Sequence, residues 1–109
     1  MAVHQFCNEG VNITIGTSAT DVYQTPSSTQ ATCHSLHIAN VTTETVTASV
    51  YIYDNSKAAS GTILKNAQIE AGNTLCWEKP LNLEESDKLQ VSTNVSANVE
   101  VFASILEIS

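Results

Sequence analysis

The chain contains no arginine, and its four lysines are set against eleven aspartates and glutamates. The formal net charge is −7 at pH 7. Affinity for nucleic acids comes largely from clustered positive charge, and arginine makes the bidentate contacts with phosphate and guanine. The composition therefore argues against nucleic-acid binding, and the same deficit argues against binding to an anionic membrane surface.

Long apolar stretches are also missing, and none approaches the ~20 residues of a membrane span. Residues 1–10 have neither the basic start nor the apolar run of a signal peptide, so we expect a chain made and kept in a cytoplasm, or released from one by lysis. The cysteines are Cys7, Cys33 and Cys76. This odd number without a secretion signal predicts free thiols that pack as small hydrophobic groups, with one disulfide as the alternative.

Aromatic residues are few: three tyrosines, two phenylalanines and one tryptophan. Trp77 follows the same alternation as Leu75 and Leu81, which places it in the core and not on a ligand platform. Tyr51 and Tyr53 lie on the polar face of their segment. Exposed tyrosines in such positions suit contact with a protein or a glycan, and they also suit simple cross-strand pairing.

What the chain does have is a regular alternation of apolar and polar residues. Every even position from Thr45 to Tyr53 is apolar, whereas the odd positions hold threonine, serine or tyrosine. The pattern returns in residues 75–83, 89–95 and 99–105. A period of two puts one set of side chains inside a sheet and the other outside. We predict an all-β fold, an antiparallel β-sandwich (jelly-roll-like or Greek key) of about eight or nine short strands. The length fits a single domain, residues 1–109.

The order of strands and turns suggests which neighbours pair. A strand over Ala31–Val41 is followed by a tight turn, and Thr45–Tyr53 is predicted to be its hairpin partner. Lys88–Asn94 and Asn98–Ile108 are predicted to form a second hairpin that closes the fold. The stretch Asp54–Gly61 is predicted to be the longest loop.

The last strand departs from the alternation because both of its faces turn apolar. In an isolated small sandwich the outer face would be wet, so the apolar residues Phe102, Leu106 and Ile108 need a covering partner. We predict that they contribute to a subunit contact, together with Tyr51 and Tyr53 as further interface residues. The alternative is a strand that crosses from one sheet to the other.

Neither catalytic residues nor a bound metal are predicted. Cys33 and His34 are neighbours in a strand and point to opposite faces, and His37 shares a face with Cys33 but lies ~13 Å along the strand. Nucleophilic catalysis therefore lacks an activating neighbour. His4 and Cys7 come nearest to a metal-ligand spacing, without forming a paired zinc motif. No cofactor is expected.

Two acidic loops leave open the question of calcium. One contains Glu84, Glu85 and Asp87, and the other contains Asp54 and Asn55. Calcium takes oxygen ligands from loops of this kind, but no EF-hand pattern is present. The alternative is an ordinary solvated acidic loop.

Several stretches together resemble small β-sandwich virion structural proteins of tailed bacteriophages, over about residues 22–108. They are Ser35-Leu36-His37-Ile38-Ala39-Asn40, the alternating Val46 to Ile52, Ala71-Gly72-Asn73-Thr74-Leu75, Pro80-Leu81-Asn82-Leu83 and Asp87-Lys88-Leu89-Gln90-Val91. Such proteins commonly have a glycine before the aspartate that opens the Lys88 strand, and Ser86 stands there in this chain.

The resemblance implies a non-enzymatic structural role without catalytic residues. It implies a capsid decoration (cement) protein that contacts other virion proteins, such as the major capsid protein, as a homotrimer or another homo-oligomer. A tail, neck, baseplate or fibre component is the first alternative. A carbohydrate- or receptor-binding β-sandwich module is the second. The expected location is the virion, after synthesis in the host cytoplasm.

Overall fold

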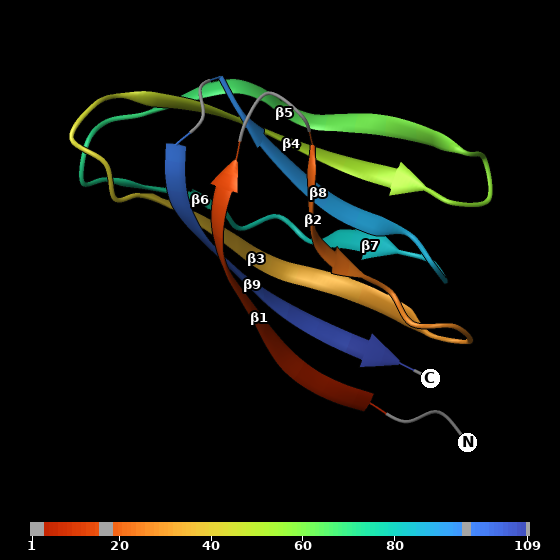
Figure 1. The fold of residues 1–109 in the computed structure, drawn as a ribbon. Helices are drawn as coiled ribbons and strands as arrows, with labels where there is room; N and C mark the ends of the chain where they lie inside the picture. The colour runs from red at the N-terminus through yellow and green to blue at the C-terminus, as the bar shows by residue number, and fades with distance from the viewer. Residues whose placement is uncertain (1–3, 16–18, 95–96, 109) are drawn as a thin grey trace.

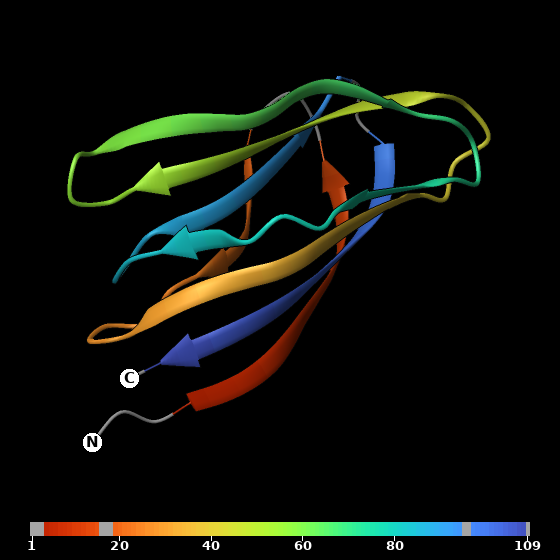
Figure 2. The same ribbon diagram turned by 180° about the vertical axis from the view of Figure 1, so that it is seen from behind.

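The computed structural model describes residues 4–15, 19–94 and 97–108, with side chains described for residues 19–94 and 99–108. Nine strands form two antiparallel sheets packed face to face (Figures 1 and 2), which confirms the predicted β-sandwich. None of the described residues is helical, and the described part of the chain holds no helix that could cross a membrane. The strands are β1 (His4–Ile15), β2 (Thr20–Gln24), β3 (Gln30–Asn40), β4 (Val46–Asp54), β5 (Ala59–Ile69), β6 (Thr74–Trp77), β7 (Leu81–Leu83), β8 (Lys88–Thr93) and β9 (Ala97–Ile108).

The five-stranded sheet has the order β1-β9-β3-β6, and β7 also pairs with β3. β6 lies opposite one part of β3 and β7 opposite another, so the two short strands together form one interrupted edge. Pro80 stands between them, where its missing N–H costs no ladder hydrogen bond. The four-stranded sheet has the order β2-β8-β4-β5.

The core lies between the sheets and consists of the side chains that the alternation assigned to the interior. Val46, Ala48 and Val50 of β4 are at most 2 % exposed, and Trp77 packs against the core from the sheet edge as predicted. The most deeply buried large side chains are Leu36, Ile38, Val46, Val50, Leu83, Leu89, Val91, Val99, Val101 and Ile105.

Both predicted hairpins are wrong. β3 pairs with β9, β6 and β7, whereas β4 pairs with β5 and β8 in the other sheet. β8 pairs with β2 and β4, whereas β9 pairs with β1 and β3. The two short links therefore carry the chain from one sheet to the other. An alternating pattern determines which side chains of a strand face the core. It does not determine whether the next strand along the chain lies beside it in the same sheet or opposite it in the other sheet.

The hairpin that does form joins β4 to β5, inside the predicted loop Asp54–Gly61. Only residues 55–58 form the turn, because β5 already begins at Ala59. Asp54 closes this turn by accepting the backbone N–H of Ser56 at 3.1 Å. The prediction of a loop is therefore wrong for Ala59, Ser60 and Gly61, whose small side chains suit the start of a largely exposed edge strand.

Asn40 fixes the link between β3 and β4. Its side chain is 1 % exposed and uses both of its polar ends. The amide nitrogen donates to the carbonyls of Glu44 and Ile69 at 2.7 and 2.9 Å, and Oδ1 accepts the backbone N–H of Thr42 at 3.0 Å. These bonds satisfy buried backbone groups where the chain leaves one sheet for the other.

Candidate interaction surface

The outer face of the five-stranded sheet, here called the β9 face, is centred on its middle strand. β9 pairs with β1 on one side and with β3 on the other along almost its whole length. Its inward side chains between Val99 and Ile105 are at most 1 % exposed, whereas Phe102 on the outer side is 47 % exposed. Leu106 and Ile108 lie on the same outer side and are half-buried.

β9 stays within one sheet, so the alternative in which the last strand crosses between sheets is wrong. Of the five predicted interface residues, Phe102, Leu106 and Ile108 come together on the β9 face. Tyr51 and Tyr53 are on β4, in the other sheet.

The strand register explains why Phe102 is so exposed. On one side its neighbour in the ladder is Gly10 of β1, which has no side chain to cover the ring. On the other side its neighbour is His37, and Cys76 of the edge strand β6 follows His37 in the same row. Cys76 is exposed and His37 is half-buried. Neither residue could be assigned to this surface from the sequence, because their partner strands were unknown.

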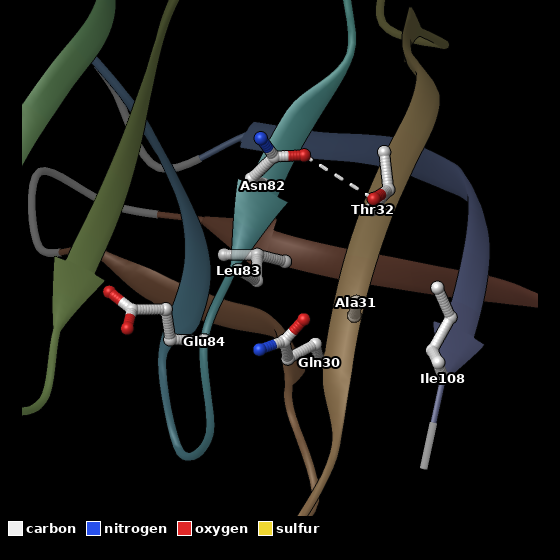
Figure 3. Close-up of a pocket in the computed structure, with 7 residues that line it drawn as sticks. All are labelled: Gln30, Ala31, Thr32, Asn82, Leu83, Glu84 and Ile108. Atoms are coloured by element: carbon white, nitrogen blue, oxygen red, sulfur yellow. Dashed lines mark hydrogen bonds between the residues drawn. The ribbon is translucent and has the colours of Figure 1, made fainter. Parts of the chain in front are cut away.

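A second row of side chains, paired across neighbouring strands, consists of Leu106 of β9, Thr32 of β3 and Asn82 of β7. Thr32 Oγ1 donates to Asn82 Oδ1 at 3.3 Å, as Figure 3 shows. Beside this row lies a pocket of about 260 Å³ with a mixed polar and apolar lining. It is lined by Gln30, Ala31, Thr32, Asn82, Leu83, Glu84 and Ile108. Glu84 is its one charged group, so the lining offers no second titratable group for acid–base chemistry.

The described side chains of the β9 face carry little charge, although the chain as a whole carries −7. Among the described side chains that point outward from β3, β6, β7 and β9, Glu100 is the only charged one. The outer face of the four-stranded sheet differs, because Lys88 and Asp21 form an ion pair on it at 3.5 Å.

Tyr51 and Tyr53 belong to this four-stranded face and interact within the chain. The Tyr51 hydroxyl and Ser92 Oγ lie 3.0 Å apart, and this hydrogen bond lowers the pKa of Tyr51. Lys88 Nζ lies 5.8 Å from the centre of the Tyr53 ring. Both side chains are half-buried, in keeping with cross-strand pairing.

Cys33 does not form a thiol–imidazole dyad with His37. A bulge between Cys33 and Ser35 changes which face of β3 each later residue occupies, so the expectation that Cys33 and His37 share a face is wrong. Cys33 is 1 % exposed in the core, and burial raises the pKa of its thiol to about 11. Cys33 and Cys76 are both free thiols. The side chains of His4 and Cys7 lie outside the described residues.

The acidic loops bind backbone N–H groups. Glu85 accepts the N–H of Ser28, while Asp87 is 4 % exposed and accepts the N–H groups of Asn55 and Glu84 at 2.9 Å each. Asp87 thereby ties the β4–β5 turn to the β7–β8 turn. Across the described part of the chain, no three histidine, cysteine, aspartate or glutamate side chains are grouped to hold a metal ion.

No protein-family model and no curated protein matches the chain. Solved structures with the same fold do exist, and the three described here have low sequence identity to this chain. A chain of the acid-stable capsid of Helicobacter pylori bacteriophage KHP30 has a TM-score of 0.61 and 13 % identity, over 100 % of this chain and 92 % of that one. A subunit of the disulfide-linked pili of Bacillus endospore appendages has a TM-score of 0.60 and 11 % identity, over 98 % and 88 %.

A chain of the infectious bursal disease virus particle gives a TM-score of 0.64 and 9 % identity. The match covers 98 % of this chain and 30 % of the viral chain, so this protein spans about a third of that chain's length. At these identities the likenesses show a shared fold, and the fold is one used by viral capsid proteins and by a pilus.

Proposed function

We propose that this protein is a non-enzymatic structural protein of a bacteriophage virion and that it decorates the outside of the capsid. The observation that carries the proposal is the β9 face, a broad surface of low charge with Phe102 exposed at 47 %. Exposed apolar surfaces of this kind are typical of protein–protein contacts. The likeness of the fold to the capsid proteins of bacteriophage KHP30 and infectious bursal disease virus supports the same role.

A decoration protein works by binding and not by chemistry. Its contacts stabilise both partners by mass action, because binding favours the folded and assembled state. A flat sheet face can bury a large area without a ligand pocket. The charge of −7 favours a position outside the shell, away from the packaged and equally negative nucleic acid. The proposed partners are the major capsid protein and further copies of this chain, and the proposed location is the virion after synthesis in the host cytoplasm.

Binding to capsid shells tests the proposal. Purified protein is mixed with expanded shells and with unexpanded precursor shells of the phage whose genome encodes it, and the pellets are analysed after sedimentation. We expect saturable binding to expanded shells at a fixed ratio to the major capsid protein. Failure to bind either form, together with absence of the chain from purified particles by mass spectrometry, would refute decoration and any other virion role.

A repeating subunit of a tail or fibre is the second candidate. It is favoured by the likeness to a subunit of disulfide-linked pili, which covers 98 % of this chain, and by the exposed Cys76. This candidate predicts rings or filaments of the purified protein in electron micrographs, and the pilus comparison adds that reductant should shorten filaments. Shell binding without rings or filaments decides for decoration.

A further inference from the structure

We propose that the β9 face docks a second copy of this chain. The inference deepens the proposed function, because it names one partner of that face, but it can be tested with the purified protein alone. It follows from the charge, the size and the centre of the face.

Two copies of a chain with a net charge of −7 repel one another. Contact is favourable only where each copy presents a surface that is locally free of like charge. The β9 face largely meets this condition, since Glu100 is the only charged side chain described among those that point outward from β3, β6, β7 and β9, and Glu84 lies at the margin, in the pocket beside Ile108. A surface of this protein that binds a positively charged partner would instead carry negative charge. The four-stranded face differs from the β9 face in carrying charged side chains of both signs, Lys88 and Asp21.

The size of the face fits a stable contact. β9 contains 12 residues, which at ~3.4 Å per residue gives a length of roughly 40 Å. Four strands lie side by side across the sheet, and at ~4.8 Å each they give a width of roughly 19 Å. The product is roughly 760 Å², close to the ~800 Å² that each partner contributes to a standard interface.

The centre of the face carries its most exposed large side chain. Phe102 lies near the middle of β9, between Gly10 of β1 and the half-buried His37 of β3. Residues that dominate binding cluster near the centre of an interface and are often aromatic. Leu106 and Ile108 extend the apolar surface towards one end.

Sedimentation of matched variants tests the inference. We expect the wild-type protein to sediment at twice its 11.7 kDa mass or more, and Phe102→Glu to sediment as a monomer with self-association weakened at least ~100-fold. The matched control is Thr62→Glu, which adds the same charge at an exposed position opposite Tyr51 in the other sheet and should assemble like the wild type. Circular dichroism verifies that each variant is folded.

Cys76 supplies a second measurement that needs no variant. It is exposed and lies in the same row of the face as Phe102, whereas Cys33 is buried. Alkylation followed by peptide mass spectrometry reads the two thiols separately. We expect Cys76 to be modified more slowly as protein concentration rises, while Cys33 stays unmodified at every concentration.

Three results would overturn the inference. They are a wild-type monomer at all concentrations, an assembly that survives Phe102→Glu in a folded protein, and an assembly broken by Thr62→Glu alone. A monomer that still binds capsid shells would leave the proposed function standing and refute self-docking. A self-associating protein that binds no shell would do the reverse.

Discussion

Replacing Asn40 by aspartate tests the idea that one buried amide fixes the link between the two sheets. The change keeps the shape of the side chain but replaces its NH₂ group by an oxygen. That NH₂ group donates to the carbonyls of Glu44 and Ile69. An ionised carboxylate takes the side-chain donor from the Ile69 carbonyl and one of two side-chain donors from the Glu44 carbonyl, which also accepts the Thr42 hydroxyl at 3.0 Å, and it repels both oxygens. A protonated carboxyl can still donate to one of them.

The expected loss is large and depends on pH. A buried polar group left without its partner costs about 1–3 kcal/mol, which is the loss expected at the buried Ile69 carbonyl, whereas the carbonyl of exposed Glu44 adds little. Domains of this kind have a total stability of about 5–15 kcal/mol. Burial raises the pKa of the introduced carboxyl above the ~3.9 of an aspartate in the unfolded chain. The folded state then holds a proton that the unfolded state has lost, so stability falls as pH rises, by up to ~1.4 kcal/mol per pH unit.

Urea unfolding at pH 5 and pH 7 measures both effects. The difference in unfolding free energy between wild type and Asn40→Asp should grow by up to about 2.7 kcal/mol between these two pH values. Asn94→Asp is the matched control, because exposed Asn94 uses its Oδ1 to accept the Thr47 N–H at 3.0 Å and aspartate keeps that acceptor. The control should change stability by less than about 0.5 kcal/mol. Equal stability of Asn40→Asp and wild type at both pH values would refute the reasoning.

Three further predictions concern single sites. Asp87→Ala should lower the unfolding free energy by about 2–4 kcal/mol in urea titrations, because the N–H groups of Asn55 and Glu84 lose their acceptor; an unchanged midpoint would contradict this role. Gly72→Ala should cost about 1 kcal/mol, since φ is +78° there and no atom lies within 4 Å of the added Cβ; a neutral or stabilising change would be inconsistent with that backbone conformation. Cys33 should react with iodoacetamide at pH 8 only as fast as the protein unfolds, because burial raises its pKa to about 11, and rapid labelling without denaturant would show an open core.

The sequence was sufficient to predict the sandwich and most of its core, because both depend on local alternation. The inward positions of β4 and β9 follow from a period of two without knowledge of any partner strand. The pairing of strands could not be predicted in the same way. Whether the link after Asn40 turns back within a sheet or crosses to the other depends on hydrogen bonds to Ile69, which is 29 residues away in sequence.

The candidate surface was predicted only in part, for the same reason. Phe102, Leu106 and Ile108 share a face because they belong to one strand. Their neighbours come from other strands, so Cys76 and His37 join Phe102 only through the register. The bulge between Cys33 and Ser35 leaves no clear signal in the residues, yet it decides which face His37 occupies.

The structure of the native particle tests the central claim most directly, namely that this chain acts as a building block through its sheet faces. We predict that cryo-electron microscopy of the virion shows the sandwich on the outer shell at a fixed symmetry, with Phe102 covered by a neighbouring copy. Particles that lack the chain, or that hold it with the β9 face open to solvent, would contradict the account.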